Sequence, residues 1–341
     1  MKILLSTCRN PHFATLSEYI EIALKAAGGD ILFFNDMDFV IPGRIRDSMS
    51  YLHNLDLKRI NRKLISAIKS FKPALFLEVG GHRILPETIE YIKKCRVKTA
   101  LLTIDAPRDF DPVAKTAPYY DFIFTGGSEA YEILKYAGVK NLHWLPFACD
   151  PDFHKPIVLT EEENQIYSCD IAFVGSVHPE LYPYRVKMLE SLSNYDLAIW
   201  GPGTEDLPSD SPLKPLIRGG KTPYNVWTKI YGAAKIVLCI HFKDLSGNIP
   251  CYQASPRVYE VMACKGFLMV DNQRDVLTLF RDREDLVVFK DIDDLKRLVE
   301  YYLHHPEERQ KITETGYKTV LSKHTYKHRI REMLSIIAQV E

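Results

Sequence analysis

Arg257 and Glu260, three residues apart in the stretch 253–271, are the side chains whose types and spacing most suggest chemistry. Ser255 is a favourable N-cap residue and Pro256 fits the first helical position, so we expect a helix to begin here. At about 100° per residue, the guanidinium and the carboxylate then lie roughly 60° apart on that helix. A phosphate could bind the N–H groups at this helix start, with Glu260 accepting hydrogen bonds from sugar hydroxyls. The alternative is a solvated i,i+3 ion pair, worth about a few tenths of a kcal/mol.

The residues that follow predict the rest of this helix and a buried strand. Apolar side chains recur at helical spacing as far as Met262. Lys265-Gly266 is expected to end the helix, with the glycine in the left-handed conformation. The apolar run 267–270 is typical of a parallel strand that is covered on both faces.

An alternation of strands and helices extends over most of the chain and predicts an α/β fold with two doubly wound parallel sheets. In such sheets ligands bind at the carboxyl ends of the strands. The stretch 147–168 has two prolines and an acidic run and is interpreted as an inter-domain connection. We expect strands at 3–6, 31–34, 74–79, 97–104, 122–125, 142–145, 170–174, 197–200, 236–240, 267–270 and 286–289. We expect further helices at 13–27, 51–71, 86–95, 127–137, 183–193, 223–233, 274–281, 291–304, 307–322 and 325–339.

Small or polar residues follow three of the strands predicted in the second half. Gly175 and Ser176 follow the strand at 170–174, Gly201 follows the strand at 197–200, and His241 follows the strand at 236–240 with Lys243 close behind. Glycine lets the backbone approach a ligand closely, which favours a shared pocket beside the helix that begins at Ser255. The alternative for the glycines is ordinary turn chemistry.

His12 and Asp105 are the candidate catalytic residues of the first half. Each follows a predicted strand, and a neutral histidine is the commonest general base near pH 7. Asp105 could serve as a base or anchor an acceptor. The alternatives are a helix-start histidine without a role and an Asx turn before Pro107.

Composition limits the classes of partner. Lys plus Arg and Asp plus Glu both number 44 in 341 residues, so no global charge favours nucleic acid or an anionic membrane. The seven cysteines form no C-x-x-C pair, which indicates reduced thiols rather than a zinc site or a disulfide framework. The sequence contains no recognisable signal peptide and no apolar run of membrane length, so we expect a cytoplasmic protein without a membrane span.

The sequence gives little support for a metal or for several common enzyme classes. D-x-D pairs occur at 36–38, 109–111, 150–152 and 291–293, and only Asp36 and Asp38 follow a predicted strand as a metal site would require. We expect no bound metal. No G-x-G-x-x-G after a strand, no Walker pattern and no G-x-S-x-G occurs, which counts against dehydrogenases, P-loop enzymes and α/β-hydrolases.

A series of short strings, in this order and spacing, resembles the CgeB-like (spore maturation protein type) glycosyltransferases, whose second half is a group-1-like glycosyltransferase domain. The resemblance covers most of the chain. The strings are Asp105-Ala106-Pro107, YDFIFTGG (120–127), LPFACDPDFHKP (145–156), DIAFVGS (170–176), AKIVL (234–238), SPRVYEVMACKGFLMVD (255–271), YYLHHPEER (301–309) and HTYKHR (324–329).

The resemblance implies a GT-B fold, in which two Rossmann-like domains face a cleft. Residues 1–150 would form the acceptor domain and residues 165–323 the nucleotide-sugar donor domain. The final helix, 325–341, would pack back on the first domain.

Donor contacts are the roles that the resemblance implies for the second half. Glu260 would hold the ribose hydroxyls, Arg257 would contact the diphosphate, and Gly175 would belong to the loop that opens the donor domain. Many retaining relatives carry two glutamates in an E-x7-E pattern. Here Gln253 stands where the first glutamate would be, so the role of that acid is unassigned.

The implied activity is transfer of a sugar from a nucleoside diphosphate donor to an acceptor hydroxyl, without a metal or another cofactor and with retention of configuration. The nucleotide, UDP or GDP, and the acceptor, whether glycan, protein or small molecule, are left open. A catalytically inactive relative that binds a nucleotide or a partner, and a nucleotide-sugar epimerase on the same fold, are the alternatives.

Overall fold

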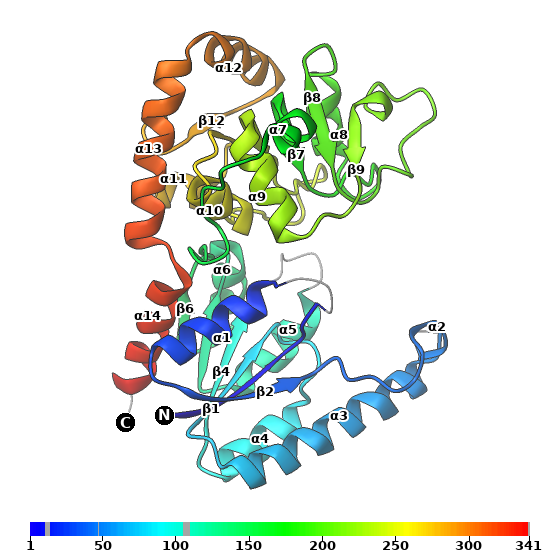
Figure 1. The fold of residues 1–341 in the computed structure, drawn as a ribbon. Helices are drawn as coiled ribbons and strands as arrows, with labels where there is room; N and C mark the ends of the chain where they lie inside the picture. The colour runs from blue at the N-terminus through cyan, green and yellow to red at the C-terminus, as the bar shows by residue number, and fades with distance from the viewer. Residues whose placement is uncertain (11–13, 47, 105–109, 340–341) are drawn as a thin grey trace. The chain divides into compact units, whose positions relative to one another are not determined.

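The structure is a computed structural model, and it describes residues 1–10, 14–46, 48–104 and 110–339. Residue contacts divide the chain into two compact units, Met1–Pro146 with Arg329–Glu341, and Phe147–His328. Each unit is built around one parallel six-stranded sheet with flanking helices (Figure 1). The last helix, α14 (Tyr326–Gln339), begins in the second unit and continues in the first.

The sheet of the first unit has the strand order β2-β1-β3-β4-β5-β6. The chain moves outward from β1 to β2 and then returns to the other side of β1, so the switch point lies between β1 and β3. Ser6 on β1 is the register partner of Glu78 on β3 at this point. The strands are β1 (Lys2–Thr7), β2 (Asp30–Asn35), β3 (Leu75–Val79), β4 (Lys98–Thr103), β5 (Phe122–Thr125) and β6 (Leu142–Trp144).

Helices cover this sheet because they present apolar stripes to its buried strands. Leu64, Ile89, Val113 and Leu134, from four different helices, pack in one buried cluster with side chains of β1, β3, β4 and β5. The α14 helix is bound to the same unit, because the Lys98 side chain donates a 3.0 Å hydrogen bond to the carbonyl of Ile337. The helices are α1 (Leu16–Ala26), α2 (Gly43–Arg46), α3 (Ser50–Phe71), α4 (Pro86–Lys94), α5 (Asp111–Thr116) and α6 (Ser128–Tyr136).

The sheet of the second unit has the order β12-β11-β10-β7-β8-β9. The chain moves from β7 to β8 and β9, and then returns to the other side of β7 at β10. The loops after β7 and β10 therefore diverge, which is where an open α/β sheet binds its ligand. The strands are β7 (Cys169–Val174), β8 (Leu197–Trp200), β9 (Ile217–Gly219), β10 (Ala234–Cys239), β11 (Leu268–Asp271) and β12 (Val287–Phe289).

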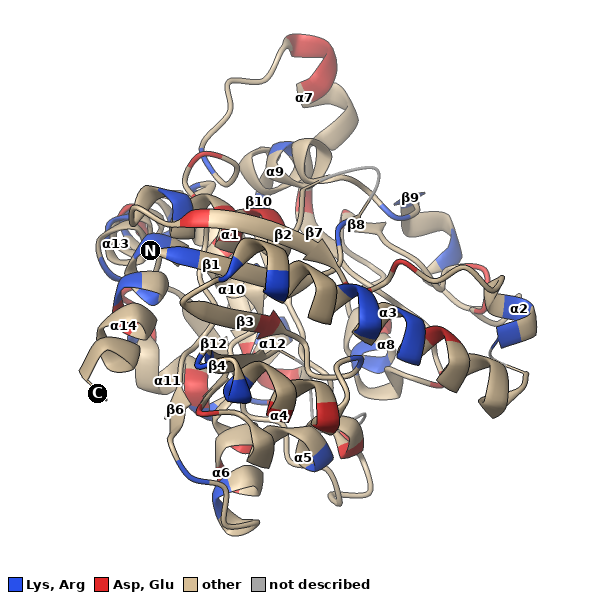
Figure 2. Ribbon diagram, turned by 90° about the horizontal axis from the view of Figure 1, so that it is seen from below, with Lys and Arg blue, Asp and Glu red and all other residues tan. Residues whose placement is uncertain are grey.

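One face of this second sheet packs on α8, α12 and α13 through a buried cluster that includes Leu189, Leu298 and Ile312. The α10 helix contacts β10 and β11, and it also packs against α9 and α13. The first turn of α7 holds Glu161, Glu162 and Glu163, and it appears as a red band in Figure 2. The helices are α7 (Glu161–Tyr167), α8 (Pro183–Glu190), α9 (Tyr224–Ala233), α10 (Pro256–Ala263), α11 (Arg274–Leu279), α12 (Ile292–His304) and α13 (Pro306–Lys323).

Each strand predicted from the sequence is present, with its ends shifted by at most two residues. The predictions missed β9 and the helices α2, α5 and α7. They were also wrong about how α10 ends, because Lys265, with φ of 57°, takes the left-handed conformation. Gly266 is needed for space, since a Cβ there would lie 2.9 Å from the carbonyl oxygen of Tyr231. Within the described residues, no helix is long and apolar enough to span a membrane.

Candidate functional site

The start of α10 lies at the carboxyl edge of the second sheet, as the sequence predicts. Ser255 has the extended backbone of an N-cap residue, with φ of −62° and ψ of 159°. Its side chain does not cap the helix, however, because the hydroxyl lies 3.4 Å from Sγ of Cys239 instead. Ser255 is therefore the N-cap residue that the sequence predicts, and its side-chain oxygen does not compete for the N–H groups of the first turn.

Arg257 and Glu260 do not form the ion pair that was the alternative to a ligand site. No contact within 4.0 Å joins their charged groups, although both residues are fully described. Arg257 instead places Nη1 3.9 Å from Sγ of Cys239 and lies over the ring of Phe173. The side chain of Glu260 is 15% exposed, and its nearest ionisable partner is His154. Burial raises the pKa of Glu260 to about 7, although Arg257 opposes the shift.

Glycine is required after β7 and after β8, because neighbouring atoms lie too close there to leave room for a Cβ. A Cβ on Gly175 would lie 2.8 Å from Nη2 of Arg257, so the guanidinium rests against the loop backbone. A Cβ on Gly201 would collide with the carbonyl oxygen of Gly175. The two strand ends are joined by the Gly175 N–H, which donates a 2.8 Å hydrogen bond to Trp200. Arg257 therefore lies at the point where these two loops meet.

Ser176 and Arg185 complete this part of the site. The Ser176 hydroxyl is buried and has no hydrogen-bond partner among the described residues. Arg185, on α8, is 7% exposed and donates to the carbonyls of Ile240 (2.9 Å) and Ser176 (2.8 Å). Burial, and then the like charge of Arg257, lower the pKa of Arg185 to about 10. Sequence reasoning missed Arg185, because an arginine in an ordinary helical pattern carries no signal of burial.

His241 is a buried residue whose side chain links Asp271 to Ser255. Its backbone N–H and Nδ1 both donate to Oδ1 of Asp271, at 2.9 and 2.7 Å. The Ser255 N–H donates to its Nε2 at 2.9 Å. Burial disfavours a second proton on this ring, whereas Asp271 and Cys239 favour one. The Ser255 N–H decides between these two states, because a protonated Nε2 could not accept its hydrogen bond. Nε2 therefore carries a lone pair, and the neutral ring keeps its proton on Nδ1.

The other candidates from the sequence fall in different places. Lys243 lies 4.7 Å above the ring of Tyr184 and lines a separate cavity of about 210 Å³. His12 and Asp105 lie outside the described residues. The structure therefore brings together Gly175, Ser176, Gly201, His241, Ser255, Arg257 and Glu260 around the switch point of the second sheet.

His154 is a further residue that sequence reasoning missed. It comes from the stretch interpreted as an inter-domain connection, yet its side chain is fully buried. Its Nε2 lies 3.8 Å from Oε1 of Glu260. An irregular segment has no hydrophobic periodicity, so nothing in the pattern distinguished a buried histidine there from a solvated one.

The first unit has its own polar cluster at the switch point of its sheet. Asp36 accepts a 3.1 Å hydrogen bond from Arg83 and a 3.5 Å bond from Ser6. Glu78 accepts a hydrogen bond from the Tyr120 hydroxyl, and burial raises its pKa to about 8. These residues are engaged with one another in a buried network.

Three of the four D-x-D pairs are likewise engaged within the protein, and Asp109 of the pair 109–111 lies outside the described residues. Asp38 forms a 2.6 Å ion pair with Lys63. Asp150 accepts from the Asp152 N–H, and Asp291 caps α12. In the part of the chain that the structure describes, no group of three or more His, Cys, Asp or Glu side chains could hold a metal ion.

Comparisons with known proteins show which proteins this chain is similar to. A family described as "Glycosyl transferase-like" matches residues 185–335. Spore protein CgeB of Bacillus subtilis (strain 168) is 22% identical over 273 residues, which covers 76% of this chain and 81% of that protein. The resemblance to CgeB-like proteins drawn from the sequence strings is confirmed.

Solved structures confirm the fold. Sucrose-phosphate synthase from Thermosynechococcus elongatus aligns over 99% of this chain and 98% of its own, with a TM-score of 0.73 at 11% identity. Anabaena HepE in complex with UDP-glucose aligns over the whole of both chains, with a TM-score of 0.70 at 9% identity. A glycosyltransferase from Rickettsia africae aligns over 98% and 97%, with a TM-score of 0.68 at 15% identity. The chain therefore has the predicted α/β fold of GT-B type, with two Rossmann-like units.

Proposed function

We propose that this protein is a glycosyltransferase that moves a sugar from a nucleoside diphosphate-sugar to an acceptor hydroxyl. The observation that carries the proposal is a pair of cations without counter-ions. Neither Arg185 nor Arg257 forms an ion pair with a carboxylate among the described residues. Cations held away from water without a partner cost free energy. A bound diphosphate would offset that cost at the sheet edge where α/β folds bind ligands.

The ribose would lie on the other side of the same helix start. Glu260 has a carboxylate that is partly exposed and makes no hydrogen bond in the described structure. A carboxylate can accept a hydrogen bond from each of the two adjacent hydroxyls of a ribose. HepE was solved with UDP-glucose, and a trehalose-6-phosphate protein of Escherichia coli with UDP-2-fluoro glucose, and both share this fold. Their ligands make UDP-sugars the first donors to test here.

Catalysis would consist of orienting the sugar and stabilising the departing diphosphate. Arg257, the first-turn N–H groups of α10 and the buried hydroxyl of Ser176 are donors placed for that charge. This arrangement needs no metal ion. Retention of configuration follows from the resemblance to retaining relatives, with Gln253 in place of the first acid of their E-x7-E pattern.

A binding screen followed by an activity assay tests the proposal. Thermal unfolding is followed with UDP, GDP, dTDP, CDP, ADP and NAD. A ligand at 100 times its dissociation constant stabilises the folded state by about 2.7 kcal/mol. We expect one nucleoside diphosphate to raise Tm in the wild type and to lose that effect in Glu260→Ala. Stabilisation by NAD alone, or by no nucleotide, would contradict the proposal.

The sugar form of the nucleotide found in this way is then incubated with and without mixed acceptors, in the presence of EDTA. Transfer that requires an acceptor and persists in EDTA supports a metal-independent transferase. Conversion of the nucleotide-sugar with no acceptor present would instead indicate an epimerase. Binding without turnover in either assay would indicate an inactive relative.

A further inference from the structure

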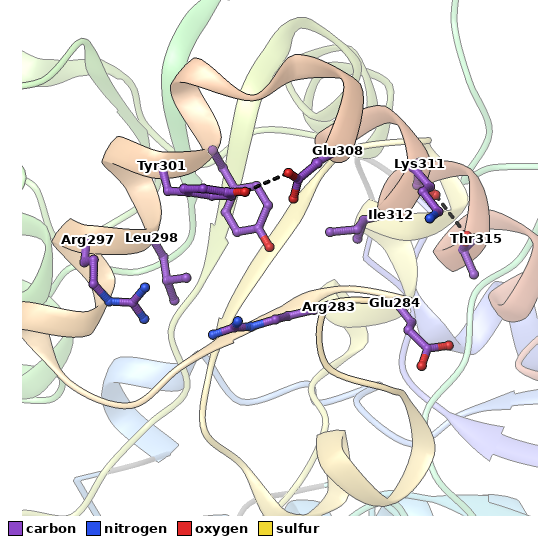
Figure 3. Close-up of a pocket in the computed structure, with 10 residues that line it drawn as sticks. Arg283, Glu284, Arg297, Leu298, Tyr301, Glu308, Lys311, Ile312 and Thr315 are labelled. Carbon is purple, nitrogen blue, oxygen red and sulfur yellow. Dashed lines mark hydrogen bonds between the residues drawn. The ribbon is translucent and has the colours of Figure 1, made fainter.

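A cavity of about 790 Å³ lies elsewhere in the second unit, between the turn that precedes β12, the end of α12 and the start of α13 (Figure 3). It lies near the amino end of β12, whereas α10 begins at the carboxyl edge of the sheet. Leu298 and Ile312 give it an apolar wall. Its lining residues therefore share nothing with the candidate donor site.

Three cationic side chains line this cavity. In Figure 3 the Arg283 and Arg297 side chains extend toward one another from different elements. Arg283 has only a long contact, 3.8 Å to Asp282, while Arg297 pairs with Asp294 on its own helix. Lys311, on α13, makes no ion pair with any described residue. The Arg283 and Arg297 side chains are each 61% exposed, so solvent screens their repulsion, but two facing cations still favour an anion between them.

The acidic residues of the rim are already engaged. Glu284 forms a 2.5 Å ion pair with Arg281, which is not one of the residues that line the cavity. Glu308 accepts a 2.7 Å hydrogen bond from the Tyr301 hydroxyl, drawn as a dashed line in Figure 3. Neither acid forms an ion pair with Arg283 or Lys311 among the described residues.

Tyr302 supplies the second, independent observation. The residue is 3% exposed and lines the cavity, and its hydroxyl makes no hydrogen bond with the described residues. The hydroxyl oxygen is not among the fully enclosed unpaired atoms of the described residues, so it is open to the cavity and can donate to a molecule there. Burial raises the pKa of this hydroxyl, Arg283 and Arg297 oppose the shift, and Glu308 and Asp282 add to it. The hydroxyl is therefore a neutral donor in the same space as the two guanidinium groups.

We propose that this cavity is a second ligand site, which binds the phosphate ester of a sugar or similar polyol. Arg283, Arg297 and the Tyr302 hydroxyl can donate to one group that has several anionic oxygens, while Lys311 lies at the other end of the cavity (Figure 3). A lone phosphate would leave most of the volume empty, since cavities of about 300–1,000 Å³ hold whole small molecules. Glu284, Glu308 and Thr315 lie on the remaining wall, where their oxygens can accept hydrogen bonds from hydroxyls.

Calorimetric titration of the full chain with glucose 6-phosphate, inorganic phosphate and glucose tests the site. We expect glucose 6-phosphate to bind more tightly than inorganic phosphate, and glucose not to bind. Arg297→Gln and Arg283→Asn should each weaken binding about tenfold, and Tyr302→Phe about fivefold. Asparagine is chosen at 283 because the backbone there has φ of 59°, which asparagine tolerates.

Lys318→Ala is the matched control, since this exposed lysine lies on α13 outside the cavity and its loss changes the net charge equally. Circular dichroism and Tm check that each variant is folded. Tyr302→Phe should not lower Tm, because its hydroxyl has no partner to lose.

Two results would overturn this site. One is failure of the wild type to bind either phosphate compound. The other is equal affinity in the wild type and the cavity variants, with binding abolished by Arg257→Met. In that case the phosphate occupies the candidate donor site instead. Failure of the nucleotide screen, by contrast, leaves this cavity unaffected.

Discussion

Nε2 of His154 lies 3.8 Å from Oε1 of Glu260, although one residue comes from an irregular connecting segment and the other from α10. The Asp150 N–H donates a 3.1 Å hydrogen bond to Nδ1 of His154, so the neutral ring carries its proton on Nε2. Burial lowers the pKa of His154 to about 4, which keeps the ring neutral at pH 7. The imidazole N–H therefore faces the carboxylate and limits where it can lie.

Two substitutions of His154 distinguish its hydrogen bond with Asp150 from its contact with Glu260. His154→Asn retains an acceptor for the Asp150 N–H but removes the group that faces Glu260. His154→Gln can place an N–H near Glu260. We expect His154→Asn to weaken binding of the nucleoside diphosphate identified by the screen three- to tenfold. This corresponds to a loss of about 1 kcal/mol of binding free energy, because the Glu260 carboxylate is no longer held in one orientation. His154→Gln should restore much of it.

Calorimetry measures both affinities, and thermal unfolding measures Tm. If His154 only supports the fold, affinity and Tm should fall together in both variants. Equal affinity in the wild type and His154→Asn would show that the contact with Glu260 has no role in binding.

Glu260 should make stability depend on pH in the direction opposite to most carboxylates. Its folded pKa is raised from 4.5 to about 7, so the folded state binds more protons than the unfolded state between these values. The free energy of unfolding therefore falls as pH rises through this range, by up to about 3 kcal/mol. Glu260→Gln removes the titration.

Urea unfolding of the wild type and Glu260→Gln at pH 4.5 and pH 8 tests this expectation. The two proteins should have similar stability at the lower pH, and the variant should be more stable at the higher pH. A constant difference at both pH values would mean that the carboxyl titrates normally.

Arg257 should matter for the diphosphate and little for folding. Arg257→Met keeps the packing over Phe173 and removes a cation that has no carboxylate partner. We expect Tm to stay the same or rise, because a buried charge is replaced by an apolar side chain of similar length. Affinity for a nucleoside diphosphate should fall about 10- to 100-fold, the usual effect of losing a charge-assisted hydrogen bond.

Affinity for the corresponding nucleoside, which has no phosphate, should be unchanged in Arg257→Met. Titration of both ligands into both proteins decides the matter. Equal losses for nucleoside and nucleoside diphosphate would argue that Arg257 shapes the pocket without contacting phosphate.

The sequence predicted the parts of the fold that depend on local pattern. Buried parallel strands appear as short apolar runs, and Ser255-Pro256 marks the start of α10 correctly. It could not predict β9, a three-residue edge strand that contains Arg218 and Gly219, because so short a strand has no apolar run. The predicted inter-domain connection also contains α7, and here the sequence does carry a local signal, the capping box between Thr160 and Glu163.

The candidate site was predictable only where its residues follow strands or begin a helix. Gly175, Gly201 and His241 were found in this way. His154 and Arg185 were not, because their importance depends on long-range burial against α10 and on the carbonyls after β7 and β10. Tertiary packing of this kind leaves no periodic trace in the chain.

Gly201 gives the sharpest test of how the site is built. A Cβ on Gly201 would collide with the carbonyl oxygen of Gly175, and the backbone there has φ of 156°. The Gly201 N–H also donates a 3.0 Å hydrogen bond to Gly219, which fixes the loop from its other side. Neither neighbour is a flexible side chain, so the loop cannot relax cheaply. We expect Gly201→Ala to lower the free energy of unfolding by about 3 kcal/mol or more.

Gly220→Ala is the matched control, because a Cβ at Gly220 meets no atom within 4 Å. Its effect on the free energy of unfolding should stay within about 0.5 kcal/mol. Urea unfolding compares the two variants, and nucleoside diphosphate binding is measured under conditions where both are folded. Movement of the Gly175 loop shifts the backbone against which Arg257 rests, so Gly201→Ala should also bind the diphosphate more weakly. If Gly201→Ala matched Gly220→Ala in stability and affinity, the two strand ends would not meet as closely as this structure places them.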